Sequence, residues 1–315
     1  MADAIRVPRK ATLLALLALT AVAPAPAHAV TSGGAAVPGG VSVPDDVGAS
    51  APTTVPDVAP KTPTGTRSSS LRLTSFTVNG GRFYEHGRSI RVGFELSGRS
   101  SASAKLKLVV VQAGNRVRVV DLGARVAGVA HSVTVPTAGL PSGDLSLRIS
   151  GRDARGRAVR RGPSAASSHA ISVQSHRFPI VGQHSFGGEG SRFGAGRPGH
   201  IHQGQDVSAP EGTPMVAARG GVVRFTGNQP GGAGVYLVIR GAGESRDYVY
   251  MHLVEGSMVV RQGQTVRTGQ LIGKVGQTGA ASGAHLHFEI WQGAWQQGGS
   301  PIDPLPLLQR WDAWS

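Results

Sequence analysis

The chain has 315 residues, and its hydrophobic fraction of 40% is ordinary for a folded protein, which excludes wholesale disorder. It contains no cysteine, so disulfides, thiolate metal ligands and a cysteine nucleophile are all excluded. The formal net charge of +14 favours polyanionic surroundings, although aromatic residues make up only 5% and no run rich in Lys and Arg occurs.

The first 29 residues have the pattern of an export signal. Arg6, Arg9 and Lys10 precede an apolar stretch over 11–22, which is too short for a comfortable membrane span, and Ala27-His28-Ala29 matches a cleavage site. We therefore predict a signal peptide over 1–29, Sec-type export, and no stable membrane insertion once the leader is removed. An uncleaved anchor is the alternative. For an exported basic protein, a bacterial cell wall with anionic polymers is a better partner than nucleic acid.

The next two segments differ sharply in composition. Residues 30–70 are rich in Pro, Gly, Ser and Thr with few large apolar side chains, which predicts a linker. Residues 71–175 alternate polar and apolar side chains between turn signals, which predicts an immunoglobulin-like β-sandwich that acts as a spacer or wall-binding module. The expected strands cover 71–78, 89–96, 105–111, 116–120, 131–135 and 145–149.

From residue 176 to residue 315, Gly-rich loops alternate with short strands. Two segments, 212–222 and 266–276, share the order of short strand, glycine turn and short strand. Such repeats are typical of small barrels or folded antiparallel sheets. The whole chain is therefore predicted to be all-β, with a sandwich followed by a second β domain over 176–315.

Four histidines and an aspartate in this last segment predict a metal site. They are His202, Asp206, His252, His285 and His287. On a strand, His285, His287 and Glu289 point to one face, so both imidazoles can reach the same site. Two imidazoles and a carboxylate suit a zinc ion that keeps a fourth position open for water, and further histidines can move protons near that water.

The order and spacing of four motifs resemble one family of enzymes. The motifs are Gly199-His-Ile-His202-Gln-Gly-Gln-Asp206, the run over 209–223, Tyr250-Met-His252-Leu, and the run over 276–289 that ends in His285-Leu-His287-Phe-Glu. Together they make residues from about 178 to 304 similar to the lysostaphin/LytM-type zinc metallopeptidases, which are peptidoglycan endopeptidases.

The resemblance implies a role for each of the five residues. His202, Asp206 and His287 would bind one zinc ion, whereas His252 and His285 would flank the water that attacks a peptide bond in a peptidoglycan stem or cross-bridge. Either histidine could be the general base. Since members that only activate other wall enzymes have usually lost these ligands, their presence favours catalysis.

Three other functional hypotheses compete with that of a wall endopeptidase. The first is a non-catalytic wall-binding or hydrolase-activating protein on the same fold, and the second is a secreted zinc protease that acts on Gly-rich protein. The third is a lipoyl-carrier-like barrel, which would need a modifiable lysine at a hairpin tip, whereas Lys274 lies in a predicted strand. The sequence sets neither the cleaved bond nor the oligomeric state.

The sequence also departs from the family pattern. Some relatives carry a tyrosine shortly before the first zinc histidine, whereas this chain has Phe193-Gly-Ala-Gly-Arg197, so Arg197 or another donor would take that role. Gln205 replaces an apolar residue and is expected to face away from the metal. His200 lacks the Gly-x-Asp partner and is not predicted to be a ligand.

Overall fold

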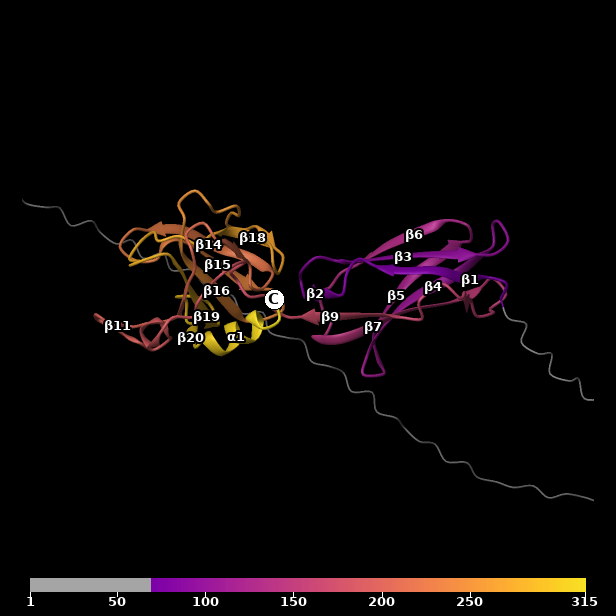
Figure 1. The fold of residues 1–315 in the computed structure, drawn as a ribbon, viewed down its shortest axis with the longest axis horizontal. Helices are drawn as coiled ribbons and strands as arrows, with labels where there is room; N and C mark the ends of the chain where they lie inside the picture. Colours follow the sequence, from indigo (N-terminus) through magenta and orange to yellow (C-terminus); the bar gives the residue numbers. More distant parts are fainter. Residues whose placement is uncertain (1–68) are drawn as a thin grey trace, which may run out of the picture. The chain divides into compact units, whose positions relative to one another are not determined.

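The computed structural model describes residues 69–315 (Figure 1). The predicted leader over 1–29 and all but the last two residues of the predicted linker over 30–70 lie outside the described residues. In the described range the helices are a 3-10 turn, η1 (Glu189–Ser191), and α1 (Leu305–Asp312), while strands supply the rest of the regular structure. The all-β prediction is therefore confirmed. No helix within residues 69–315 has the length and apolarity that a membrane crossing requires.

The first nine strands form two sheets around one core, which we call the sandwich. The strands are β1 (Arg72–Val78), β2 (Arg82–Tyr84), β3 (Ile90–Ser97), β4 (Ser103–Gln112), β5 (Asn115–Val126), β6 (Ala130–Val135), β7 (Gly143–Asp153), β8 (Arg160–Arg161) and β9 (His169–Gln174). One sheet has the order β6-β3-β1-β8, and the other has the order β2-β9-β7-β4-β5. The six predicted strands correspond to β1 and β3 through β7.

Alternating side chains explain why these segments become strands. In β3, Ile90, Val92, Phe94 and Leu96 are buried, whereas the side chain of Arg91 points to solvent. Because successive side chains of a strand point to opposite faces, one face of each sheet enters the shared core and the other remains outside. Both sheets contribute to a single hydrophobic cluster, as the sandwich prediction requires.

The remaining strands form a second β unit with its own core, which we call the C-terminal domain. They are β10 (Gly196–Arg197), β11 (His200–Ile201), β12 (Gln205–Ser208), β13 (Pro214–Val216), β14 (Gly221–Gln229), β15 (Gly234–Gly241), β16 (Arg246–Leu253), β17 (Thr265–Val266), β18 (Leu271–Lys274), β19 (His285–Gln292) and β20 (Ser300–Ile302). The main sheet has the order β12-β19-β16-β15-β14-β17, and β20 pairs with β19.

The two similar sequence segments pair with each other. Strand β13 from the first and strand β18 from the second form an antiparallel two-stranded sheet, in which Pro214 lies opposite Lys274. The similar segments therefore build one folded antiparallel unit, as predicted. Since Lys274 is the last residue of a strand and not the tip of a hairpin, the lipoyl-carrier interpretation lacks its modifiable lysine.

The main sheet has one apolar face and one face with polar groups, and this difference positions the site. On β19, Leu286, Phe288 and Ile290 are fully buried in the large hydrophobic cluster of the C-terminal domain. The alternate residues, His285 and His287 among them, point to the opposite face. In the sheet order, strand β19 lies between β12 and β16, so groups from all three strands can meet there. Figure 1 shows β16 and β19 in this domain.

Candidate metal centre

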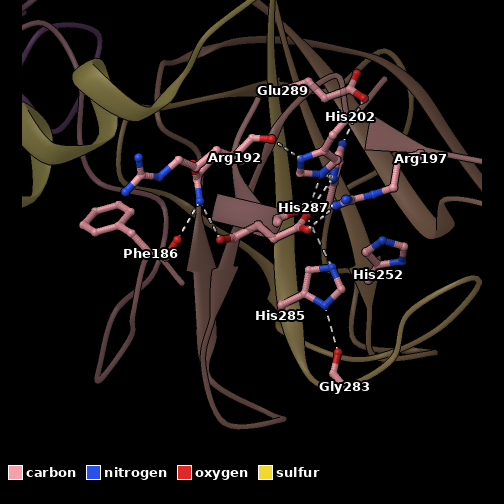
Figure 2. A network of polar contacts seen from close by, with 12 residues as sticks. Phe186, Arg192, Arg197, His202, His252, Gly283, His285, His287 and Glu289 are labelled. Carbon is pink, nitrogen blue, oxygen red and sulfur yellow. Dashed lines mark hydrogen bonds and ion pairs between the residues drawn. The ribbon is translucent and has the colours of Figure 1, made fainter. Parts of the chain in front are cut away.

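Three predicted residues come together on the polar face of the main sheet. Strand β12 runs antiparallel to β19 with Asp206 directly opposite His287, and His202 lies just before β12. The His202 Nε2 atom lies 3.0 Å from Asp206 Oδ1 and 2.9 Å from His287 Nδ1, and the last two atoms are 2.9 Å apart. Within residues 69–315 this is the only group of three or more side chains with metal-ligand geometry. Figure 2 shows His202 beside His287 at this site.

Hydrogen bonds on the far side of each imidazole decide which nitrogen faces the site. His202 Nδ1 lies 2.8 Å from the carbonyl oxygen of Arg192, and His287 Nε2 lies 3.0 Å from Glu289 Oε1. Because these oxygens accept, these two ring nitrogens donate, so in the neutral imidazoles that a metal requires, His202 Nε2 and His287 Nδ1 direct their lone pairs at the site beside Asp206. Either protons on the histidines or a metal cation offsets the repulsion between three such electron-rich atoms, and this donor set fits zinc.

Asp206 has a further partner on the side away from the histidines. The guanidinium of Arg197 donates to Asp206 Oδ2 at 3.3 Å and to the carbonyl oxygen of Gly190 at 2.8 Å. Arg197 therefore orients the carboxylate so that Oδ1 faces the two histidines. The sequence suggested Arg197 only as a replacement for a missing tyrosine, and no pattern signalled this contact.

Glu289 is buried and fully engaged. Its side chain is on the same face as His287, and its Oε2 atom accepts from the indole N–H groups of Trp291 at 2.7 Å and Trp295 at 3.1 Å. The backbone N–H of Trp295 in turn donates to the buried Asp247 at 2.8 Å. Since indoles can only donate, this arrangement holds Glu289 as an acceptor for His287 Nε2.

Sequence reasoning placed Glu289 on the correct face without assigning it a role. The alternation of β19 was the available signal, because residues two apart on a strand are neighbours on one face. The contribution of Trp295 was missed, since it follows β19 in a loop whose path no periodicity predicts.

His252 and His285 lie beside the triad with their rings 4.7 Å apart (Figure 2). His252 Nδ1 donates to the carbonyl oxygen of Thr278 at 2.7 Å, and His285 Nδ1 donates to that of Gly283 at 2.8 Å. Both Nε2 atoms are therefore free for other partners, and His285 Nε2 lies 3.5 Å from Asp206 Oδ1. His252 has a positive φ of 65°, a strained backbone conformation for a residue other than glycine.

Burial and charge together perturb the proton equilibria of the cluster. Burial opposes ionisation of Asp206, but hydrogen bonds from His202 and His287 hold its pKa below the usual range. Burial likewise opposes the charged form of His287, yet its hydrogen bonds to Asp206 and Glu289 raise its pKa to about 9. For His252, burial dominates and lowers the pKa to about 4, so this imidazole is neutral near pH 7.

The cluster forms the floor of a cleft that a substrate could enter. Residues from four parts of the chain line it, within 190–206, 231–233, 251–252 and 280–289. His200, which was not predicted as a ligand, lines this cleft and is exposed, with its Nδ1 atom near the carbonyl oxygen of Pro198. Gln205 lies opposite Phe288 in the register, on the core face and away from the triad, as expected.

Comparison with known proteins finds similarity over the part of the chain that holds these residues. Residues 200–304 match the model for Peptidase family M23. A segment of 89 residues is 43% identical to the peptidoglycan DD-endopeptidase ShyA of Vibrio cholerae, covering 28% of this chain and 20% of that protein. A segment of 133 residues is 33% identical to the lipoprotein NlpD/LppB homolog of Pseudomonas aeruginosa, covering 42% of each chain. The chain thus spans less than half the length of these curated relatives.

Solved structures are also similar over this part of the chain. The catalytic domain of the antimicrobial peptidase lysostaphin from Staphylococcus simulans is 28% identical, with a TM-score of 0.35. The alignment covers 40% of this chain and 92% of that one.

Proposed function

We propose that the protein is a zinc-dependent endopeptidase that hydrolyses peptide bonds of peptidoglycan, because residues 200–304 match the model for Peptidase family M23. The observation that carries this proposal is the convergence of His202 Nε2, Asp206 Oδ1 and His287 Nδ1 beside two further histidines in one cleft. Peptidoglycan is the substrate of a named relative, and a leader over 1–29 would deliver the protein to it.

A zinc ion held by His202, Asp206 and His287 would supply a Lewis acid that lowers the pKa of a water and polarises the scissile carbonyl. The other steps fall to side chains of this protein. His252 is neutral near pH 7, so its free Nε2 atom can accept the proton of the attacking water. His285 Nε2 lies on the same side and, when this ring is protonated on both nitrogens, can donate to the developing oxyanion, while the proton that His252 takes from the water returns to the leaving amine.

Neighbouring groups fix the orientation of the three candidate ligands. Glu289 orients His287, Arg197 orients Asp206, and the carbonyl oxygen of Arg192 orients His202. We infer that the enzyme acts as a secreted or wall-associated protein.

Release of soluble fragments from purified peptidoglycan tests the proposal. The chain without residues 1–29 is incubated with and without zinc, beside His287→Ala and beside His200→Ala as a matched control from the same cleft. We expect release that needs zinc and His287 but not His200, and mass spectrometry of the fragments would identify the cleaved bond.

The same experiment separates the proposal from its main alternative. A folded, zinc-loaded protein that releases no fragments from several peptidoglycan types would instead be a wall-binding or hydrolase-activating protein. Release from Gly-rich protein in place of peptidoglycan would point to a secreted protease of another specificity.

A further inference from the structure

Positive charge is distributed very unevenly along the described chain. Residues 69–175 contain 16 Lys and Arg residues against 5 Asp and Glu residues, whereas residues 176–315 contain 11 against 9. Most of the excess charge of the protein therefore belongs to the sandwich, and the C-terminal domain is nearly balanced. A charge excess confined to the part without the metal centre is not explained by hydrolysis.

Few of these cations are neutralised inside the sandwich. Among the Lys and Arg residues of 69–175, only Arg157 forms a salt bridge within the sandwich, to Asp153 at 2.8 Å. None of the other guanidinium and ammonium groups forms a salt bridge within residues 69–175, although Asp121 of β5 lies opposite Lys107 and Arg152 donates to the carbonyl oxygen of Gly156. Since cations outnumber carboxylates by about three to one in this part, their net field attracts an anionic partner.

Part of this charge is ordered on one sheet face, which we call the basic face and define as Lys105, Lys107, Arg148 and Arg152. Strands β4 and β7 are neighbours in the five-stranded sheet (Figure 1). In their register Lys105 lies directly opposite Arg152, Lys107 opposite Ser150, and Arg148 opposite Val109. All four cations are exposed, and the intervening residues Leu106 and Leu108 enter the core.

The spacing of the basic face suits a linear chain of negative charges. Residues two apart on a strand are about 6.8 Å apart, and neighbouring strands are about 4.8 Å apart. These separations are within the Debye length of about 8 Å at physiological salt, so the four charges act on a partner together. Like charges directly opposite each other destabilise a sheet, so the Lys105–Arg152 pair carries a cost that an anionic partner would remove.

The strands around the basic face lack what recognition of bases requires. Strands β4, β5 and β7 contain no aromatic residue. Proteins that bind single-stranded nucleic acid through a sheet stack the bases on aromatic side chains. The face therefore favours a polyanion without bases.

We propose that the basic face of the sandwich binds a linear phosphodiester polymer of the bacterial cell envelope and so holds the protein at the wall. The inference goes beyond the proposed hydrolysis, because the four residues are outside the metal centre, and its choice of a cell-envelope polymer rests on the proposed wall-associated location. Attachment through the sandwich would raise the local concentration of the C-terminal domain near its substrate.

Binding of the chain without residues 1–29 to immobilised poly(glycerol phosphate) tests this proposal. The variant Lys105→Glu/Lys107→Glu/Arg148→Glu is compared with Arg72→Glu/Arg91→Glu/Arg160→Glu, which changes the charge equally on exposed residues of the four-stranded sheet. We expect the first variant to lose at least about tenfold in affinity and to show a weaker dependence on salt between about 50 and 200 mM, and the second to lose much less. His287→Ala should bind like the unmodified protein.

Three outcomes would overturn the proposal. Equal losses in the two triple variants would mean that total charge, and not this face, determines binding. Tighter binding to a single-stranded oligonucleotide of equal charge, or to vesicles of anionic lipid, would assign the face to those partners instead. Thermal unfolding checks that both variants fold; if the first does not, Lys105→Gln and Lys107→Gln replace it, and unchanged affinity in both would equally contradict the proposal.

Discussion

At the scale of single residues, Glu289 determines which nitrogen of His287 faces the metal centre. In Glu289→Gln the amide oxygen can still accept from His287, but the amide NH₂ group then meets the two indole N–H donors of Trp291 and Trp295. Loss of such a partner typically weakens metal binding about 10- to 100-fold. We expect a loss of this size in competition between the protein and a chelator for cobalt(II), where Co²⁺ substitutes for zinc and its absorption reports the ligand set.

An exposed carboxylate provides the control for that experiment. Glu255→Gln removes the same charge from a solvent-exposed position, so it should leave cobalt affinity unchanged. Equal affinity of Glu289→Gln and the unmodified protein would show that the buried carboxylate does not orient His287.

His252 makes the stability of the metal-free protein depend on pH. Burial lowers its pKa to about 4, whereas an unfolded chain has a histidine pKa near 6.5. Between these values the unfolded chain binds more protons than the folded one, so folding loses stability as the pH falls through this window. From about pH 7 to about pH 4, we expect the free energy of unfolding to fall by up to about 3 kcal/mol more than it does in His252→Gln. Urea unfolding of metal-stripped protein measures this difference. If the free energy of unfolding changed with pH in the same way in the unmodified protein and in His252→Gln, the lowered pKa of His252 would be contradicted.

At the scale of elements, close contact between β12 and β19 fixes the triad, and Gly204 permits that contact. A Cβ atom at residue 204 would lie 2.5 Å from the carbonyl oxygen of Phe288 and 2.8 Å from His287 Nε2. Gly204→Ala should therefore push β12 away from β19, destabilise the domain by about 1–3 kcal/mol and weaken metal binding. Chemical denaturation and cobalt titration measure the two effects.

A second glycine separates this steric effect from a general effect of losing glycine. Gly196 in β10 has open space around its Cβ direction, so Gly196→Ala should change neither stability nor metal affinity by a comparable amount. If both substitutions behaved alike, the close approach at Gly204 would not be what holds the register.

Sequence patterns predicted the long elements better than the short ones. Strands such as β3 and β4 alternate over eight or more residues, so their periodicity is unambiguous. By contrast, β10 and β11 have two residues each, too few to show any period. Helix α1 was not predicted either, although Leu308 and Trp311 on one of its sides are buried.

The same reasoning explains which parts of the metal centre were predictable. Imidazole and carboxylate groups have few chemical roles, so His202, Asp206 and His287 stand out at their spacings. Their orientation depends largely on backbone carbonyl oxygens, such as those of Arg192, Thr278 and Gly283. Every residue has such an oxygen, and only the folded path of the loop decides which one meets a histidine.

At the scale of the whole molecule, the sandwich and the C-terminal domain have separate hydrophobic cores. All three candidate ligands belong to the C-terminal domain. Zinc that binds only the folded site stabilises that domain by about 4 kcal/mol at a thousand times its dissociation constant. In calorimetry of the chain without residues 1–29, removal of zinc by a chelator should therefore lower the midpoint temperature of one unfolding transition. The midpoint temperature of the sandwich transition should not change.

Two variants assign the transitions and complete the argument. Phe94→Ala removes a buried side chain from the sandwich core and should reduce the free energy of unfolding of the sandwich by about 3–5 kcal/mol. Only the midpoint of the transition that is insensitive to zinc should therefore fall. His287→Ala should remove the response to zinc altogether, because the lost imidazole leaves two ligands. A zinc response that moves both transitions, or that survives in His287→Ala, would mean that the ion acts at a place other than the triad.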